Sequence, residues 1–318
     1  MPEVRVDPLS GLKTIIAAAR ADRPNSGLSV TPGEPLDPAS DPFLPGHEDE
    51  TMPTLYTDAD PWTVRAFDNR YPALTAAADA PERDANPDLF TVQPATGAHE
   101  VIVNAPEPVA SLSELSVEQV VRAVDGWRER MRAHVDRPYR HLIVNEGRQA
   151  GSSIPHTHAQ LMALDFVPAA VARERERFGA YAVRTMGGNL LADLLQEEVR
   201  RRERVVAIDS EAVLLTKFAS SSPYHLMLVP RRSRTHFEHE GPTGAALLAD
   251  GLRRLKARFG ASPPLNLWIR TAPGGAEHFC WRIEIQPRLG QPSGFEIGTG
   301  VHICALAPEQ AAAELRDL

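Results

Sequence analysis

Cysteine, long apolar runs and excess positive charge are all scarce in this sequence of 318 residues. Only Cys280 and Cys304 are present, which excludes a disulfide framework and a Cys-x-x-Cys zinc cluster and makes a reducing cytoplasm the default location. No stretch approaches the length of a membrane span, and the first residues lack a basic segment leading into an apolar run. The formal net charge of -8 argues against a nucleic-acid partner, because affinity for the phosphate backbone comes from clustered Lys and Arg.

Proline is abundant, with 28 residues, beside 42% hydrophobic and 24% charged residues. Such a composition is typical of a globular protein with many extended connections and argues against a mainly helical bundle. Residues 23–60 are rich in Pro, Asp, Gly and Ser and predict a long loop with little regular structure. The chain length predicts either two domains or one sheet-based unit built from two similar halves.

The same order of elements recurs along the chain. In the first half, the patterns predict strands within 62–72 and at 101–103, a helix over 116–134, and strands over 139–147 and 153–164. In the second half, they predict a helix over 189–206, strands over 212–220 and 224–231, a helix over 243–260, and strands over 265–273 and 278–289. Two strand-strand-helix-strand-strand halves suggest a duplication, and we place them at residues 1–170 and 171–318.

One short stretch contains several side chains that can take part in catalysis or bind a ligand. Residues 156–160 read HTHAQ, so that on a strand His156, His158 and Gln160 share one face. A neutral imidazole attacks phosphorus well when its second nitrogen holds the proton, and a neighbouring backbone carbonyl can fix that tautomer. Gln160 can donate an amide N–H to a phosphate oxygen, and Gly147 with the following AGSS run can bring backbone N–H groups close. The motif alone is equally compatible with a structural histidine or with a metal-ligand pair.

Several further motifs occur in an order that resembles the galactose-1-phosphate uridylyltransferase family, the transferase branch of the histidine-triad superfamily. The resemblance extends over nearly the whole chain and rests on the segments VDPLSG, RADRP, FDNRYPAL, GAHEVIV, SLSELSVEQVVRAVDGWRERM, VNEGRQAGSSIPHTHAQLMAL, FASSSPYHLMLVPRR, WIRTAPGG and PRLGQPSGFEIGTGVHI. It implies an α+β, duplicated histidine-triad-like fold with an antiparallel sheet and packed helices in each half. It also implies a homodimer whose active sites are completed across the subunit interface.

The resemblance also implies roles for individual residues. His158 matches the nucleophile that becomes nucleotidylated, and Gln160 matches the glutamine that steadies the phosphoryl group and replaces the third histidine of the hydrolases. Substrate contacts are implied for Arg20, Arg23, Asn69, Asn145, Gly151, Ser153 and His156. The two arginines match residues that reach the nucleotide phosphates from the partner subunit. Asn69 is also compatible with a simple turn before Tyr71 and Pro72, and the arginines with a solvated surface.

The metal sites of the family are degraded in this sequence. The family's zinc site typically uses a Cys-Pro-x-Cys pair, a histidine in the segment that reads HEV here, and the first histidine of the catalytic strand. Asp41 and Leu44 stand where the cysteine pair belongs, while His99 and His156 remain. Asp41, His99 and His156 make at most a weak oxygen–nitrogen site, so we expect no structural zinc and no other cofactor.

Three more positions bear on metal binding. His47 is an additional candidate ligand beside the degraded zinc site. A second metal site of some members is lost, because Ser233 and Arg282 stand at ligand positions, so we expect packing or Arg282 ion pairs there instead.

The leading hypothesis from these observations is a nucleotidyltransferase. We expect His158 to accept an NMP group from an NDP-sugar and to pass it to a sugar 1-phosphate in a double displacement. One alternative is an ADP-sugar or dinucleoside polyphosphate phosphorylase that uses inorganic phosphate, and another is a non-catalytic nucleotide-binding protein. The expected partners are nucleotide sugars and phosphorylated small molecules; the base and the sugar are not specified by the sequence.

Overall fold

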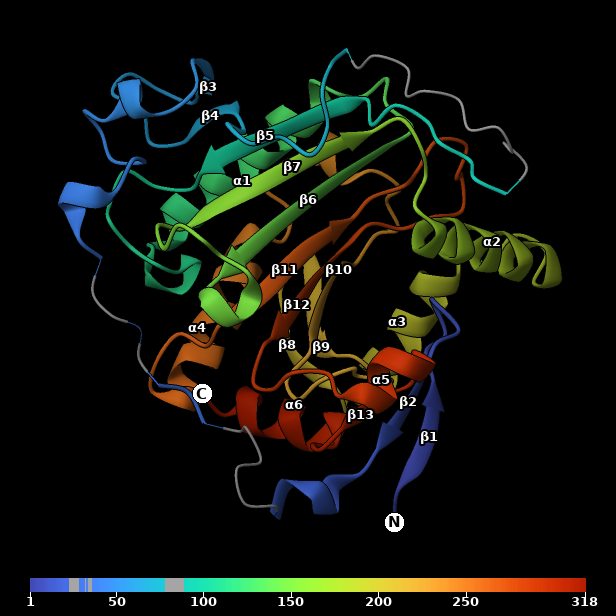
Figure 1. Cartoon of the computed structure of the whole chain (residues 1–318). Coiled ribbons are helices and arrows are strands. Elements are labelled where there is room, and N and C mark those ends of the chain that lie inside the picture. The colour runs from blue at the N-terminus through green and yellow to red at the C-terminus, as the bar shows by residue number, and fades with distance from the viewer. Residues whose placement is uncertain (23–28, 32, 34–35, 78–88) are drawn as a thin grey trace.

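The computed structural model describes residues 1–22, 29–31, 33, 36–77 and 89–318, and most of their strands join one antiparallel sheet (Figure 1). The ten strands lie in the spatial order β3 (Thr54–Thr57), β4 (Arg65–Asp68), β5 (Gly97–Val103), β7 (His158–Leu164), β6 (Tyr139–Glu146), β11 (Leu265–Arg270), β12 (Arg282–Pro287), β10 (Leu226–Pro230), β9 (Ala212–Thr216) and β8 (Val205–Ile208). A separate sheet contains β1 (Glu3–Val6), β2 (Lys13–Ile16) and β13 (His302–Cys304).

The two halves of the large sheet contain the same order of elements. The helices are α1 (Val117–Arg132), α2 (Ala169–Arg184), α3 (Leu190–Arg201), α4 (Ala245–Phe259), α5 (Gly294–Thr299) and α6 (Pro308–Arg316). The chain order β4-β5-α1-β6-β7 recurs as β9-β10-α4-β11-β12, which confirms the α+β class and the repeated element order. The two expected sheets are fused into one, because β6 and β11 pair along the seam with Asn145 opposite Asn266.

The two faces of the sheet are covered differently. On one face, α1, α4 and α6 pack on a single core that crosses the seam and includes Trp127, Leu161, Leu248 and Ile283. On the other face, a second core under α2 and α3 covers only the second half of the sheet. The first half of this face carries a small cluster around Phe43 instead. Among the described residues, no helix is both long and apolar enough to cross a membrane.

Several elements were not predicted from the sequence. Helix α2, the strands β1, β2 and β13 and the helices α5 and α6 lie outside the predicted segments. The stretch 23–60 was predicted as loop, but it contains β3 and the short 3-10 helices Pro38–Ser40 and Glu48–Glu50. The helix predicted over 189–206 ends at Arg201, because Arg202 is left-handed (φ 59°) and the chain then enters β8.

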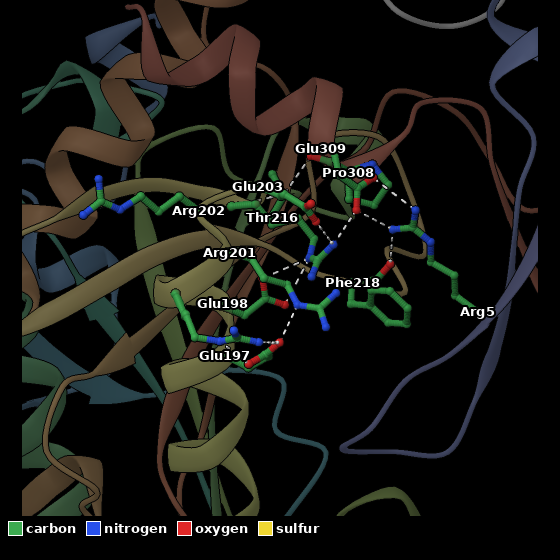
Figure 2. Close-up of polar contacts among 12 residues, drawn as sticks. Arg5, Glu197, Glu198, Arg201, Arg202, Glu203, Thr216, Phe218, Pro308 and Glu309 are labelled. Carbon is green, nitrogen blue, oxygen red and sulfur yellow. Dashed lines mark hydrogen bonds and ion pairs between the residues drawn. The ribbon is translucent and has the colours of Figure 1, made fainter.

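The two ends of the chain are tied to the second half by ion pairs. Arg5 of β1 binds Glu309 of α6 at 2.8 Å (Figure 2). Arg204, which precedes β8, binds both Glu309 and Glu198 of α3. The ring of Phe218 lies under both guanidinium groups, 4.7 Å from Arg5 and 5.0 Å from Arg204. Because several charges share this network, it is worth more than isolated surface pairs.

The contact between α1 and the sheet generates a prediction about Gly126. A Cβ at this position would lie 2.6 Å from Cγ1 of the buried Val64, whereas a Cβ at Gly179 of α2 meets nothing within 4 Å. Alanine favours a helix over glycine by about 1 kcal/mol, but overpacking costs about 1–3 kcal/mol. We expect Gly179→Ala to raise the free energy of unfolding and Gly126→Ala to lower it in urea titrations. Equal stabilisation by both substitutions would contradict the close packing of α1.

Candidate active site

The catalytic strand predicted from the sequence is β7, and it presents His158 and Gln160 on the face opposite α1. Ala159 and Leu161 of the same strand lie in the core under α1, so the alternate residues point away from that core. Residues paired across antiparallel strands share a face: Val103 of β5 pairs with His158, and His99 pairs with Met162. On the other side, Val144 pairs with Ala159, so that Asn145 of β6 lies beside His158.

The ring of His158 is held in one tautomer. Its Nδ1 lies 2.7 Å from the carbonyl oxygen of His156 and therefore donates a proton to it. Its Nε2 has no hydrogen-bond partner among the described residues, and it is not one of the fully buried unpartnered atoms, although the side chain is only 6% exposed. Burial lowers the pKa of His158, while the hydrogen bond to the His156 carbonyl and the nearby Asp41 oppose that shift. The arrangement provides a neutral imidazole with a free lone pair on Nε2.

His156 anchors the peptide that orients His158. Its Nδ1 lies 2.7 Å from Oδ2 of Asp41 and its Nε2 lies 2.9 Å from the carbonyl oxygen of Ala105. Although burial opposes the shift, the bonds from His156 and from the N–H of Phe43 lower the pKa of Asp41. The ring of Phe43 packs edge-on against His158 at 5.2 Å. Both ring nitrogens of His156, which was predicted to contact the substrate, are thus engaged inside the protein.

Gln160 belongs to a polar cluster on the same strand as His158. Its Oε1 lies 3.0 Å from Nε2 of His99, and Nδ1 of His99 accepts the backbone N–H of Ala73 at 3.1 Å. Asn69 is also here, with its Nδ2 3.2 Å from the same ring and its Oδ1 accepting the N–H of Tyr71. The structure therefore brings Asn69 to Gln160, and it also shows the turn that Asn69 was predicted to form.

The remaining predicted residues are distributed over three places. Asn145 accepts a hydrogen bond from Nδ2 of Asn266 at 2.8 Å, and the same amide of Asn266 donates to the carbonyl of Ala150 in the glycine-containing loop. In that loop Gly151 is left-handed (φ 90°) and Ser153 is exposed. Arg20 lies in the 3-10 helix Ala18–Asp22 on the second half, away from β7 in the chain's own sheet, and Arg23 lies outside the described residues.

Two cavities open on this face of the sheet. The smaller, about 350 Å³, is lined by His141, Ile143, Asn145, Asn266, Leu267, Trp268, Arg270 and Gln286. The larger, about 630 Å³, lies over the second half; it shares Trp268, Arg270 and Gln286 with the smaller one and includes Arg20. His158 does not itself line either cavity but lies on the strand beside Asn145, about 5 Å from the neighbouring backbone. The smaller cavity thus begins at Asn145, next to His158.

Sequence reasoning missed the polar support behind the catalytic strand. Glu146 is buried and accepts hydrogen bonds from the N–H of Leu112 (2.7 Å), from Ser111 (2.7 Å) and from Thr157 (3.2 Å), which lies between the two histidines. Burial raises the pKa of Glu146 to about 7 in spite of these donors. Because the folded pKa exceeds the unfolded one, Glu146 costs stability increasingly as the pH rises from about 4.5 to about 7. A lone Glu at a strand end gives no sequence signal for such a role.

Comparison with known proteins identifies the chain's family. The model of the galactose-1-phosphate uridyl transferase N-terminal domain matches residues 1–168, which is more than half of the chain. The chain belongs to the galactose-1-phosphate uridyl transferase family. A model of a domain of unknown function (DUF4921) matches residues 108–317.

Relatives of this family member cover its full length. ADP-glucose phosphorylase of Arabidopsis thaliana is 29% identical over 100% of this chain and 93% of its own. A probable galactose-1-phosphate uridylyltransferase of Drosophila melanogaster is 26% identical over 100% of this chain and 95% of its own. The crystal structure of the Arabidopsis ADP-glucose phosphorylase with bound ADP-glucose superposes with a TM-score of 0.83 at 26% identity, covering 100% of this chain and 99% of that one.

The side chains at the expected ligand positions of this family member do not fit the zinc site that the resemblance implies. His99 was predicted to remain with Asp41 and His156, but the β5–β7 register puts it opposite Met162, where it binds Gln160. The ring of His156 is used by Asp41 and Ala105, and His47 donates to the Asp41 carbonyl at 2.8 Å. Within the described ranges, no three His, Cys, Asp or Glu residues are grouped to hold a metal ion.

At the second metal position an ion pair replaces the ligands. The Arg282 guanidinium binds Glu174 at 2.9 Å and Glu284 at 2.7 Å, and all three side chains are buried. This confirms the prediction of Arg282 ion pairs in this region, where a fixed cation lies between two buried carboxylates.

Because the side chains at both expected metal positions are bound to other protein groups, we predict that the stability of the protein does not depend on a metal ion. We expect EDTA to leave the melting temperature unchanged, and we expect metal analysis of the purified protein to find no stoichiometric zinc. Asp41→Asn should lower the free energy of unfolding by about 3–5 kcal/mol, because it breaks a buried pair. A chelator-dependent fall in melting temperature together with one bound zinc per chain would show that Asp41 and His156 hold a metal after all.

Proposed function

We propose that this enzyme transfers the nucleotidyl group of an NDP-sugar through a covalent intermediate on His158. The observation that carries the proposal is the geometry of that ring: Nδ1–H is fixed on the His156 carbonyl, and Nε2 keeps a free lone pair. A structural histidine buried in a sheet normally has both nitrogens satisfied, as His156 does here. A site that holds one nitrogen and leaves the other open is suited to nucleophilic attack.

The proposed reaction has two displacements. In the first, the lone pair of His158 Nε2 forms a bond to the α-phosphorus, and the bond from that phosphorus to the bridging oxygen breaks, so that the sugar 1-phosphate leaves with the electron pair. In the second, an oxygen of the acceptor phosphate attacks the same phosphorus and the N–P bond breaks, which restores neutral His158. Both leaving groups are stable without protonation, so the chemistry depends on positioning and on charge stabilisation by Gln160 rather than on a general acid.

The smaller cavity suits the sugar-phosphate half of the donor. It starts at Asn145 beside His158 and continues over the seam to Asn266 and Arg270. The amide pair Asn145–Asn266 offers donors and acceptors to sugar hydroxyls, and Arg270 offers a cation to a phosphate. The nucleoside then lies on the other side of His158, over β5 and the Asn69 turn.

The comparisons favour inorganic phosphate as the acceptor in place of the sugar 1-phosphate preferred from the sequence alone. The relative with 29% identity and the structure with a TM-score of 0.83 are both named ADP-glucose phosphorylase. A phosphorylase of this kind would release NDP and sugar 1-phosphate. The uridylyltransferase reaction is the second candidate, because several relatives at 26–27% identity carry that name.

We further propose the assembly and location expected from the sequence, a homodimer in the cytoplasm, with the boundary between the halves at residue 170. Arg20 lines the larger cavity of its own second half, which agrees with its delivery to the nucleotide of a second copy. Both cysteines are free and buried, which agrees with a reducing compartment.

Trapping the intermediate tests the nucleophile. With ADP-glucose or UDP-glucose and no acceptor, intact-mass analysis should show one acid-labile NMP adduct per chain. His158→Ala should abolish it, because the attacking nitrogen is gone, and Gln160→Ala should slow its formation roughly 10²-fold. His278→Ala, at an exposed histidine, is the control and should behave as the wild type.

The second half-reaction identifies the acceptor. Addition of inorganic phosphate to the adduct should release NDP, whereas a transferase would release NDP-sugar only with a sugar 1-phosphate. If no common nucleotide donor gives an adduct, the protein is a nucleotide-binding protein without this activity.

The environment of His158 also sets the pH dependence of adduct formation. Burial lowers the pKa of His158, and within the described ranges His156 and Asp41 are the charged groups that act on it, so the ring stays neutral below the usual histidine range. The single-turnover rate should therefore be constant from about pH 8 to about pH 6.5 and should fall only at lower pH. A midpoint at or above about 6.5 would mean that the ring is more solvated than the structure indicates.

A further inference from the structure

His99 and Ala73 lie behind Gln160, on the side away from His158. His99 is buried on β5, the strand that pairs directly with β7, and it lies opposite Met162 of β7. It has no acidic side chain within ion-pair distance in the described part of the chain, and its two ring nitrogens face Ala73 on one side and Gln160 on the other. Its neighbours therefore give it no role as a metal ligand or as half of an ion pair.

The backbone of Ala73 fixes the tautomer of His99. The N–H of Ala73 can only donate, so His99 Nδ1, 3.1 Å away, must accept. The ring proton is then on Nε2. Nε2–H faces Oε1 of Gln160 at 3.0 Å and the amide nitrogen of Asn69 at 3.2 Å, and only the oxygen can accept it.

The position of Ala73 is itself well fixed. The turn before it is held by the N–H of Asn69 on the His99 carbonyl at 2.8 Å and by the N–H of Tyr71 on Asn69 Oδ1 at 2.8 Å. Leu74, directly after it, is buried in a small core with Tyr139, Leu164 and Val171. The donor that sets the tautomer is thus part of a packed turn.

We infer that His99 is a positioning residue that makes Gln160 a hydrogen-bond donor toward the transferred phosphoryl group. An amide side chain can present either its oxygen or its NH₂ group, and the two differ little in shape. A phosphoryl group in transfer carries negative charge on its oxygens, so only the NH₂ group stabilises it. By binding Oε1, His99 prevents the flipped state and directs the NH₂ group away from itself, and Nε2 of Gln160 is not among the occluded unpartnered atoms.

This inference rests on the proposed nucleotidyl transfer to His158, and a double-mutant cycle tests it. His99→Phe keeps a ring of similar size and removes the Nε2–H donor. In the wild-type background it should slow single-turnover adduct formation roughly tenfold or more, with little change in the donor concentration that gives half-maximal rate, because the lost interaction acts on the phosphoryl group in transfer. In the Gln160→Ala background the same substitution should change the rate less than about twofold, because its only route of action is gone.

Two further measurements keep the test decisive. His99→Gln, whose amide N–H can reach the place of the imidazole Nε2–H, should recover part of the rate lost in His99→Phe, and it replaces His99→Phe if the latter does not fold. Additive effects in the cycle, or a wild-type rate in His99→Phe, would overturn the inference while the wild-type adduct still forms. Failure of the wild type to form any adduct on His158 would instead overturn the proposed function.

Discussion

The hydrogen bond from His158 Nδ1 to the carbonyl of His156 is the constraint on which the site depends. The bond is only as well placed as the peptide that carries the carbonyl, and that peptide precedes the start of β7, outside the regular ladder. The side chain of His156 fixes it from behind through Asp41 and Ala105. The His-x-His spacing therefore has a physical meaning here: the first ring positions the backbone, and the backbone sets the tautomer of the second ring.

The thin cover over the face that carries His158 follows from the way in which the two halves join. One continuous core under α1, α4 and α6 supports the sheet across the seam, so the other face of the first half is covered only by the small clusters around Phe43 and Leu74. The second half is covered on both faces, whereas the first half keeps polar side chains on its free face. Asn266 ties the glycine-containing loop to the seam through Asn145 and Ala150, so the loop before the histidines is positioned by the other half of the chain.

The sequence predicts those parts of the molecule whose signals are local. The strand over 158–164 and the helical spacing of 117–131 need only period and polarity, and the face shared by His158 and Gln160 follows from alternation. His156 was predicted to lie on the same strand face, but it precedes β7. The missed parts depend on contacts between distant segments: Asp41 meets His156 across 115 positions, and His99 meets Gln160 across 61. Spacing alone grouped His99 with Asp41 and His156 as ligands, because it carries no information on register. The α2 helix was missed although its apolar residues Val171, Phe178 and Ala182 pack inward, because the charged run RERER at 173–177 interrupts its apolar pattern.

The duplication also explains why one half would carry the chemistry. Strands β7 and β12 hold corresponding places in the two halves; one begins at His158 with Gln160 two residues on, and the other begins at Arg282 with Glu284 two residues on. A guanidinium has no lone pair to offer to phosphorus, and that of Arg282 is held between Glu174 and Glu284. The carboxylate of Glu284 cannot donate to a phosphate oxygen as the amide of Gln160 can, and it is already bound by Lys217 at 3.0 Å. The same strand position therefore holds a histidine with an unpartnered Nε2 in one half, and in the other half an arginine fixed between two carboxylates.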